Sequence, residues 1–192
     1  RSAYNTARFD RQFLLTTNEG GALLGSNCDA TWEGTHLGGW SIFCFESDLD
    51  YDHEEDPSVR SVRQRSLAID YVMDHRSGIP KVLAARVLRT FDIGWYDSQL
   101  QQDTGEERPS WAVWAGIVAY WAVLPLSLLG LRRLPSRERP FLLAPVVVTL
   151  LTALVFYAGH RLRVIGEPAL AIAAAIQLAA LWERRRPATV GD

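Results

Sequence analysis

Residues 111–131 constrain this chain more than any other segment, because they form a run of 21 residues without a charged side chain. About 20 consecutive apolar residues are needed to cross the hydrocarbon core of a bilayer. Trp111 and Trp114 lie at the start of the run, where interfacial aromatic residues are common. The run therefore predicts a transmembrane helix.

Two more uncharged runs follow, at residues 141–159 and 168–182. The second of them is short and rich in alanine, and it is long enough to span only if Val164 and Ile165 extend it. An interfacial or re-entrant helix is the alternative for this segment. We expect three transmembrane helices, at about residues 111–131, 141–159 and 164–182, within a helical region covering 111–186.

The charges are distributed unevenly along the chain. Residues 1–110 contain 18 acidic and 11 basic side chains, whereas residues 111–192 contain 4 and 9. A basic half indicates a nucleic-acid or membrane partner, and the apolar runs favour membrane lipids, so we expect no nucleic acid. Arginines follow the first and third runs and predict cytoplasmic ends there: Arg132, Arg133, Arg137, Arg139, Arg184, Arg185 and Arg186.

This topology predicts a multi-pass membrane protein. Lys81 is the only lysine beside 19 arginines, which suggests a GC-rich bacterial genome and hence a bacterial plasma membrane. Residues 1–110 would form an extracytoplasmic domain, and residues 187–192 a cytoplasmic tail. The chain begins with Arg1 and shows no signal peptide in its first residues, so we expect further segments upstream to carry the acidic half across the membrane.

The acidic half predicts a small α/β domain that is mainly helical. Residues 13–17 resemble a strand and are followed by a turn signal at 18–21. Apolar residues recur at helical spacing over 58–76 and again over 80–92, after Pro80. The expected fold is therefore an α-rich α/β domain followed by three transmembrane helices.

Cys28 and Cys44 are the only cysteines. Two cysteines in an extracytoplasmic segment predict a disulfide, and a pair of reduced thiols is the alternative. The acidic residues of 46–56 alternate at Asp48, Asp50 and Asp52, but they lack the glycine and glutamate positions of a calcium-binding loop. We interpret this segment as a solvated acidic loop and predict no metal site in the chain.

The loop that contains His160, Arg161 and Arg163 is basic, although the predicted topology places it at the outer face. Two interpretations fit this exception to the positive-inside rule. The arginines bind an anionic ligand such as a lipid phosphate, or they extend to ordinary headgroups. Neither residue pattern nor spacing decides between them.

Several short motifs, in this order, resemble one family over residues 27–182. They are Asn27-Cys28-Asp29-Ala30-Thr31 with Gly34, Leu37-Gly38-Gly39-Trp40 with Cys44, Ile79-Pro80-Lys81-Val82, Ala85-Arg86-Val87-Leu88-Arg89-Thr90-Phe91, and His160-Arg161-Leu162-Arg163 with Glu167-Pro168-Ala169. Together they resemble the C-terminal part of bacterial membrane glycosyltransferases of the GT-C superfamily. The resemblance is to actinobacterial members of the dolichyl-phosphate-mannose or aminoarabinose transferase-like kind.

The resemblance implies an enzyme that transfers a sugar from a polyprenyl-phosphate donor to an extracytoplasmic acceptor. In this family the catalytic acid lies near the N-terminus of the enzyme, so the resemblance assigns no catalytic residue here and implies that this fragment alone is inactive. It places Arg161 and Arg163 at the lipid phosphate with His160, and gives Glu167 the role of orienting an arginine. The resemblance does not decide whether the whole enzyme uses a divalent cation. The alternatives are a non-enzymatic membrane-anchored protein with an outer interaction domain, or another kind of membrane enzyme.

Overall fold

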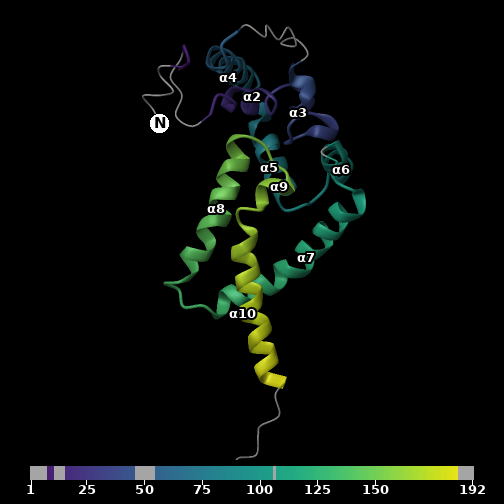
Figure 1. Cartoon of the computed structure of the whole chain (residues 1–192), viewed down its shortest axis with the longest axis vertical. Helices are drawn as coiled ribbons and strands as arrows, with labels where there is room; N and C mark the ends of the chain where they lie inside the picture. The colour runs from purple at the N-terminus through teal and green to yellow at the C-terminus, as the bar shows by residue number, and fades with distance from the viewer. Residues whose placement is uncertain (1–7, 11–15, 46–54, 106, 186–192) are drawn as a thin grey trace, which may run out of the picture. The chain divides into compact units, whose positions relative to one another are not determined.

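The computed structural model describes residues 8–10, 16–45, 55–105 and 107–185 (Figure 1). The chain divides into two compact units. Unit 1 combines residues 1–98 with 152–160, and unit 2 combines residues 99–151 with 161–192.

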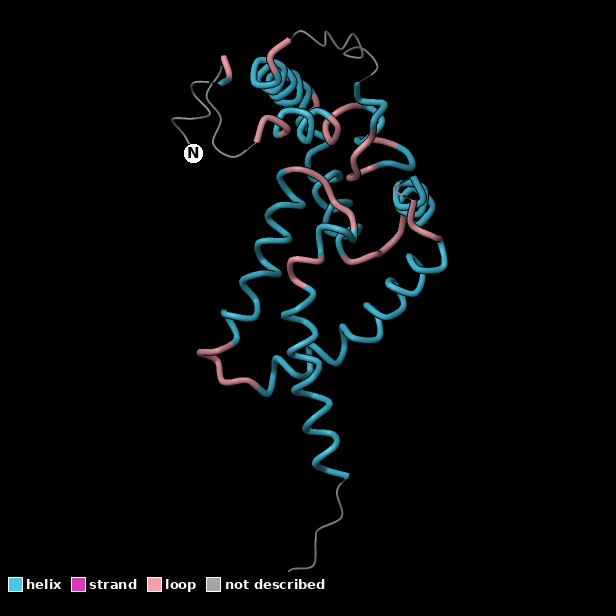
Figure 2. The backbone as a smooth tube through the Cα atoms, in the orientation of Figure 1, coloured by secondary structure: helices cyan, strands magenta, loops and turns pink. Residues whose placement is uncertain are grey.

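Every regular element in the described residues is helical, and Figure 2 shows no strand among them. The predicted α/β class is therefore wrong. The glycine- and tryptophan-rich stretch forms α3 (Asp29–Trp32) and the 3-10 helices η1 (Gly34–His36) and η2 (Ile42–Phe45). The α3 turn begins with Cys28, whose backbone N–H donates to the Thr31 hydroxyl at 3.3 Å, a local contact that favours a helical start. Of the strand predicted at 13–17, residues 13–15 lie outside the described part.

In unit 1, the helices α2 (Glu19–Leu24), α4 (Pro57–Asp74) and α5 (Ile79–Thr90) carry the core. Both helices predicted from apolar spacing are confirmed as α4 and α5. The Asp56 carboxylate accepts the Ser58 N–H at 2.7 Å and caps α4, and Pro57 occupies the first helical turn. A short 3-10 turn, η3 (Arg76–Gly78), separates α4 from α5.

The predicted disulfide is present in unit 1, where Cys28 and Cys44 join across a Cα–Cα distance of 5.6 Å. It closes the loop that contains α3 and η1. Buried Trp32, Leu37, Val82 and Ala85 pack this loop against α5. The disulfide therefore supports a segment whose own helices are too short to be stable alone.

In unit 2, α7 (Ser110–Arg133) packs on α10 (Glu167–Arg185). The helices approach closely because small residues lie between them. The Ser127 hydroxyl donates to the Leu170 carbonyl at 2.7 Å, and Gly130 leaves no room for a side chain against Ala173. The boundaries between the two units fall within three helices, α6 (Tyr96–Gly105), α8 (Arg139–Val155) and α9 (His160–Arg163).

One helix among the described residues, α7, is long and apolar enough to cross a membrane. Its 24 residues give a length of about 36 Å, against about 30 Å of hydrocarbon. Only 22% of its most apolar stretch is buried, which is unlike the core helix of a soluble domain. Trp111, Val118 and Leu128 are among its exposed apolar side chains.

The prediction of three spanning helices is wrong. The second predicted span, α8, has only 17 residues because the chain leaves the helix after Val155, and the Ala158 N–H then donates to the Gly38 carbonyl at 3.0 Å. In α10, Glu167 at one end and Glu183 and Arg184 at the other limit the uncharged run to about 22 Å. Length and end charges therefore separate these helices from α7.

Candidate functional site

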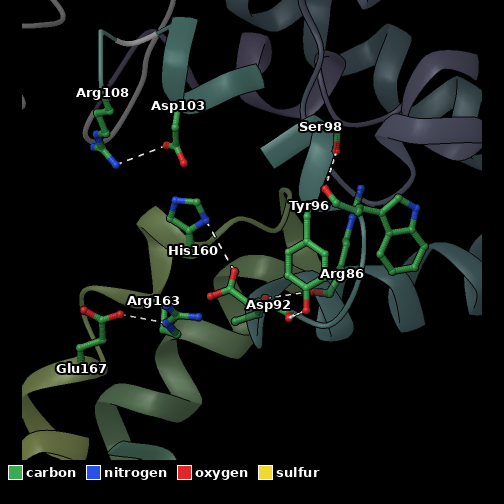
Figure 3. Close-up of polar contacts among 11 residues, drawn as sticks. Arg86, Asp92, Tyr96, Ser98, Asp103, Arg108, His160, Arg163 and Glu167 are labelled. Carbon is green, nitrogen blue, oxygen red and sulfur yellow. Dashed lines mark hydrogen bonds and ion pairs between the residues drawn. The ribbon is translucent and has the colours of Figure 1, made fainter. Parts of the chain in front are cut away.

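An ion pair between a buried arginine and a half-exposed glutamate joins α9 to α10 in unit 2. The Arg163 Nε donates to Glu167 Oε1 at 2.9 Å, across one helical turn of sequence spacing (Figure 3). The turn between the two residues is closed by a hydrogen bond from the Gly166 N–H to the Arg163 carbonyl at 2.8 Å. Arg163 is 5% exposed, whereas the Glu167 side chain is 43% exposed. The arginine is thus held deep in the unit by a carboxylate at its edge.

The guanidinium of Arg163 also stacks on an aromatic ring of α7. Its central carbon lies 3.5 Å from the centroid of the Tyr120 ring, and Tyr120 is itself buried. Cation–π contacts of this kind are stronger where water is excluded. Tyr120 lies near the middle of α7, so the ion pair packs against the central part of the one described helix that is suited to cross a membrane.

The residues around the pair combine positive charge with exposed apolar surface. Arg161, Arg163 and Glu167 together carry a formal charge of +1. Val164 and Ile165, directly after Arg163, are 60% and 48% exposed. An arginine-bearing turn with exposed aliphatic side chains suits a ligand that has an anionic group and a hydrocarbon chain.

His160, the fourth residue predicted at this site, belongs to unit 1. Its Nδ1 lies 3.6 Å from the Asp92 carboxylate, which is fully buried (Figure 3). Asp92 follows the end of α5 with a φ of 53°, a conformation that aspartate tolerates better than most residues. The structure therefore brings Arg163 and Glu167 together, places Arg161 in the same unit, and engages His160 with Asp92.

Tyr120 was missed by the sequence reasoning. Tyrosine in membrane helices favours the two interfaces, so a tyrosine in the middle of an uncharged run was a usable signal for a buried polar contact. Metal binding has no geometric support in the described part of the chain, where no three His, Cys, Asp or Glu side chains gather as a ligand set. The alternating residues Asp48, Asp50 and Asp52 lie outside that part.

No family model, curated protein or solved structure matches this chain.

Proposed function

We propose that this chain is the C-terminal portion of an integral-membrane glycosyltransferase that takes a sugar from a polyprenyl-phosphate donor and transfers it to an extracytoplasmic acceptor. The observation that carries the proposal is the buried Arg163, which pairs with Glu167 and packs against Tyr120 of α7. Burying a charged group is costly, and the charged groups that membrane proteins keep usually serve a substrate or ion path. The motif resemblance implies that this substrate is a lipid-linked sugar.

The chemistry of the donor fits this turn. A polyprenyl phosphate has an anionic headgroup on a long hydrocarbon, and the turn offers Arg161 and Arg163 beside exposed Val164 and Ile165. Glu167 holds the Arg163 guanidinium in one orientation, so little order is lost when a phosphate arrives. During transfer, the arginines would stabilise the charge that develops on the departing lipid phosphate. No catalytic residue is assigned to this portion.

In this proposal α7 anchors the chain in a bacterial plasma membrane. The acidic residues before α7 face the extracytoplasmic side, where the disulfide is stable. Arg132 and Arg133 at the end of α7 mark the cytoplasmic side. The polar partners are the lipid-linked donor and the surrounding lipid headgroups.

The proposal is tested by the equilibrium partition of radiolabelled polyprenyl phosphate between nanodiscs that contain the full chain and empty nanodiscs of the same phosphatidylcholine. We expect saturable enrichment in the loaded nanodiscs. Arg163→Gln removes a charge-assisted contact worth about 1.5–3 kcal/mol, so the affinity should fall at least tenfold. Glu167→Gln should give a smaller loss, because it releases the orientation of Arg163 and keeps its charge.

Arg137→Gln is the matched control, because it removes one arginine from the same unit in the segment between α7 and α8. It should leave the partition unchanged. If Arg137→Gln and Arg163→Gln weaken the partition equally, the binding depends only on the net charge of the chain and not on a site at Arg163. If uncharged polyprenol is enriched as strongly as the phosphate, the proposed donor site is wrong and the non-enzymatic anchored protein is favoured.

A further inference from the structure

Unit 1 contains a cavity of about 250 Å³ that lies between α4, α5 and the segment at 152–160. This volume holds about eight groups of the size of a water molecule, which is enough for a headgroup and a short alkyl segment. Aliphatic and aromatic side chains form most of the wall, including Val72, Trp32 and Leu154. The polar exceptions are Asn27 and Arg86.

Arg86 is a buried cation that pairs with no carboxylate among the described residues. It is 4% exposed, and its guanidinium donates to the Leu154 carbonyl at 2.7 Å, the Ser26 carbonyl at 2.9 Å and Asn27 Oδ1 at 3.2 Å. All three acceptors are uncharged, and the buried Nε finds no partner within the described structure. Burial lowers the pKa of Arg86 to about 10, so the side chain is still charged at neutral pH. An unpaired buried charge is costly, and an anion at this position would remove that cost.

Arg89, one turn later on α5, shows what a purely structural buried arginine looks like in this unit. It is 2% exposed, and it donates from Nε to the Leu37 carbonyl at 2.6 Å and from its terminal nitrogen to Ser98 Oγ at 2.7 Å. Its Nε is therefore used, and Arg89 does not line the cavity. Arg86 differs in both respects, so burial and carbonyl contacts alone do not explain it.

The cavity is accessible through an apolar rim. Ile69 and Met73 on α4 and Val155 at the end of α8 line it, and each exposes about half of its surface. A hydrocarbon chain that covered these side chains would bury apolar area that is now exposed. The cavity thus offers a cation at its wall and an aliphatic path to the outside.

We propose that this cavity binds a single-chain amphiphile, whose phosphate or carboxylate headgroup pairs with Arg86 and whose alkyl chain lies against α4 and α5. This site lies wholly in unit 1 and does not depend on the donor site proposed for unit 2. Asn27 holds Arg86 at the cavity wall, because its Oδ1 accepts from both the Arg86 guanidinium and the indole N–H of Trp32.

The test is calorimetric titration of the full chain in phosphatidylcholine nanodiscs, with heats from empty nanodiscs subtracted. The probes are octyl phosphate, octanoate, octan-1-ol and inorganic phosphate. We expect a saturable site for octyl phosphate or octanoate that remains in the donor-site variant Arg163→Gln, and at least tenfold weaker binding of octan-1-ol and inorganic phosphate to it. Equal binding of octan-1-ol would show an apolar pocket only, and equal binding of inorganic phosphate would show a plain anion site; either result overturns the proposal.

Two pairs of variants locate the site. Arg86→Lys keeps the charge but loses the planar fork of donors, so binding should weaken at least tenfold, whereas Arg89→Lys should leave it unchanged. Met73→Glu adds a carboxylate at the half-exposed rim and should also weaken binding at least tenfold. Leu67→Glu is its control, because Leu67 is similarly exposed on α4 and does not line the cavity.

The rim pair decides the outcome if the arginine variants fail to fold, since both side chains are about half-exposed on α4 and their substitution disturbs the core less. Equal affinities in Met73→Glu and Leu67→Glu would overturn the proposal. The donor-site variant Arg163→Gln should keep the octyl phosphate site that Met73→Glu weakens. A loss there with no loss in Met73→Glu would instead assign the amphiphile to unit 2.

Discussion

The contact between α7 and α10 predicts opposite effects for the same substitution at two glycines of one helix. A Cβ built on Gly130 overlaps the carbonyl oxygen of Ala173 and lies 2.7 Å from its carbonyl carbon. A Cβ built on Gly116 meets no atom of the described structure within 4 Å. Gly130→Ala must therefore push the two helices apart, whereas Gly116→Ala changes only the backbone.

The magnitudes follow from two opposing terms. Alanine favours a helix over glycine by about 0.8–1.0 kcal/mol, and both variants gain this term. Overpacking typically costs about 1–3 kcal/mol, and the upper end applies at Gly130 because the obstructing carbonyl is backbone and cannot rotate away. We expect Gly130→Ala to lower the free energy of unfolding by about 1–2 kcal/mol and Gly116→Ala to raise it by up to about 1 kcal/mol.

Far-UV circular dichroism during chemical unfolding in mild detergent micelles measures both changes. The reasoning requires the two variants to move in opposite directions from the unsubstituted chain. If both stabilise the protein equally, α7 and α10 do not approach at Gly130, and the packing described for unit 2 is refuted.

Two further predictions concern unit 1. Reduction of the Cys28–Cys44 disulfide should lower the free energy of unfolding by about 3 kcal/mol, the chain-entropy value for a loop of this length. Thermal unfolding with and without reductant measures this change. If reduction changes nothing, the packing alone holds the loop. The hydrogen bonds from Ser58 hold the pKa of the Asp56 carboxyl below its ordinary value of 3.8. The ionised cap therefore stabilises α4 above pH 3.8, and this stabilisation is lost as the pH falls through the lower pKa of the folded state. Asp56→Ala should therefore lower the unfolding temperature at pH 6 and change it less at pH 2.5, and an equal effect at both values would exclude the ionised cap.

The helices with regular apolar spacing or uncharged length were predictable. Apolar periodicity located α4 and α5, and the uncharged run located α7 within two residues at each end. Pattern reasoning failed where tertiary contacts decide. The stretch that contains Gly34 and Trp40 has no periodicity, and short helices form there because the disulfide and the packing of Trp32 against α5 support them.

The candidate site was predictable in part, because charged residues in an apolar region mark it directly. Arg163 and Glu167 are four residues apart, a spacing that allows contact along a helical turn, and the structure joins them. Tyr120 lies 43 residues earlier in the chain, so its contact with Arg163 depends on how α7 packs in unit 2. Arg86 appeared in the sequence analysis only within a motif of the resemblance. That its described hydrogen-bond acceptors are all uncharged becomes visible only from its neighbours in space.

The central claim is that the turn at Arg163 receives a lipid phosphate, and photo-crosslinking tests it most directly. A polyprenyl phosphate with a diazirine next to its headgroup is incorporated with the full chain in phosphatidylcholine nanodiscs, irradiated, and mapped by peptide mass spectrometry. The account predicts labelling at Val164 and Ile165 that excess unlabelled polyprenyl phosphate suppresses and that Arg163→Gln abolishes. Labelling that is spread along the exposed face of α7, with no suppression by competitor, would contradict it.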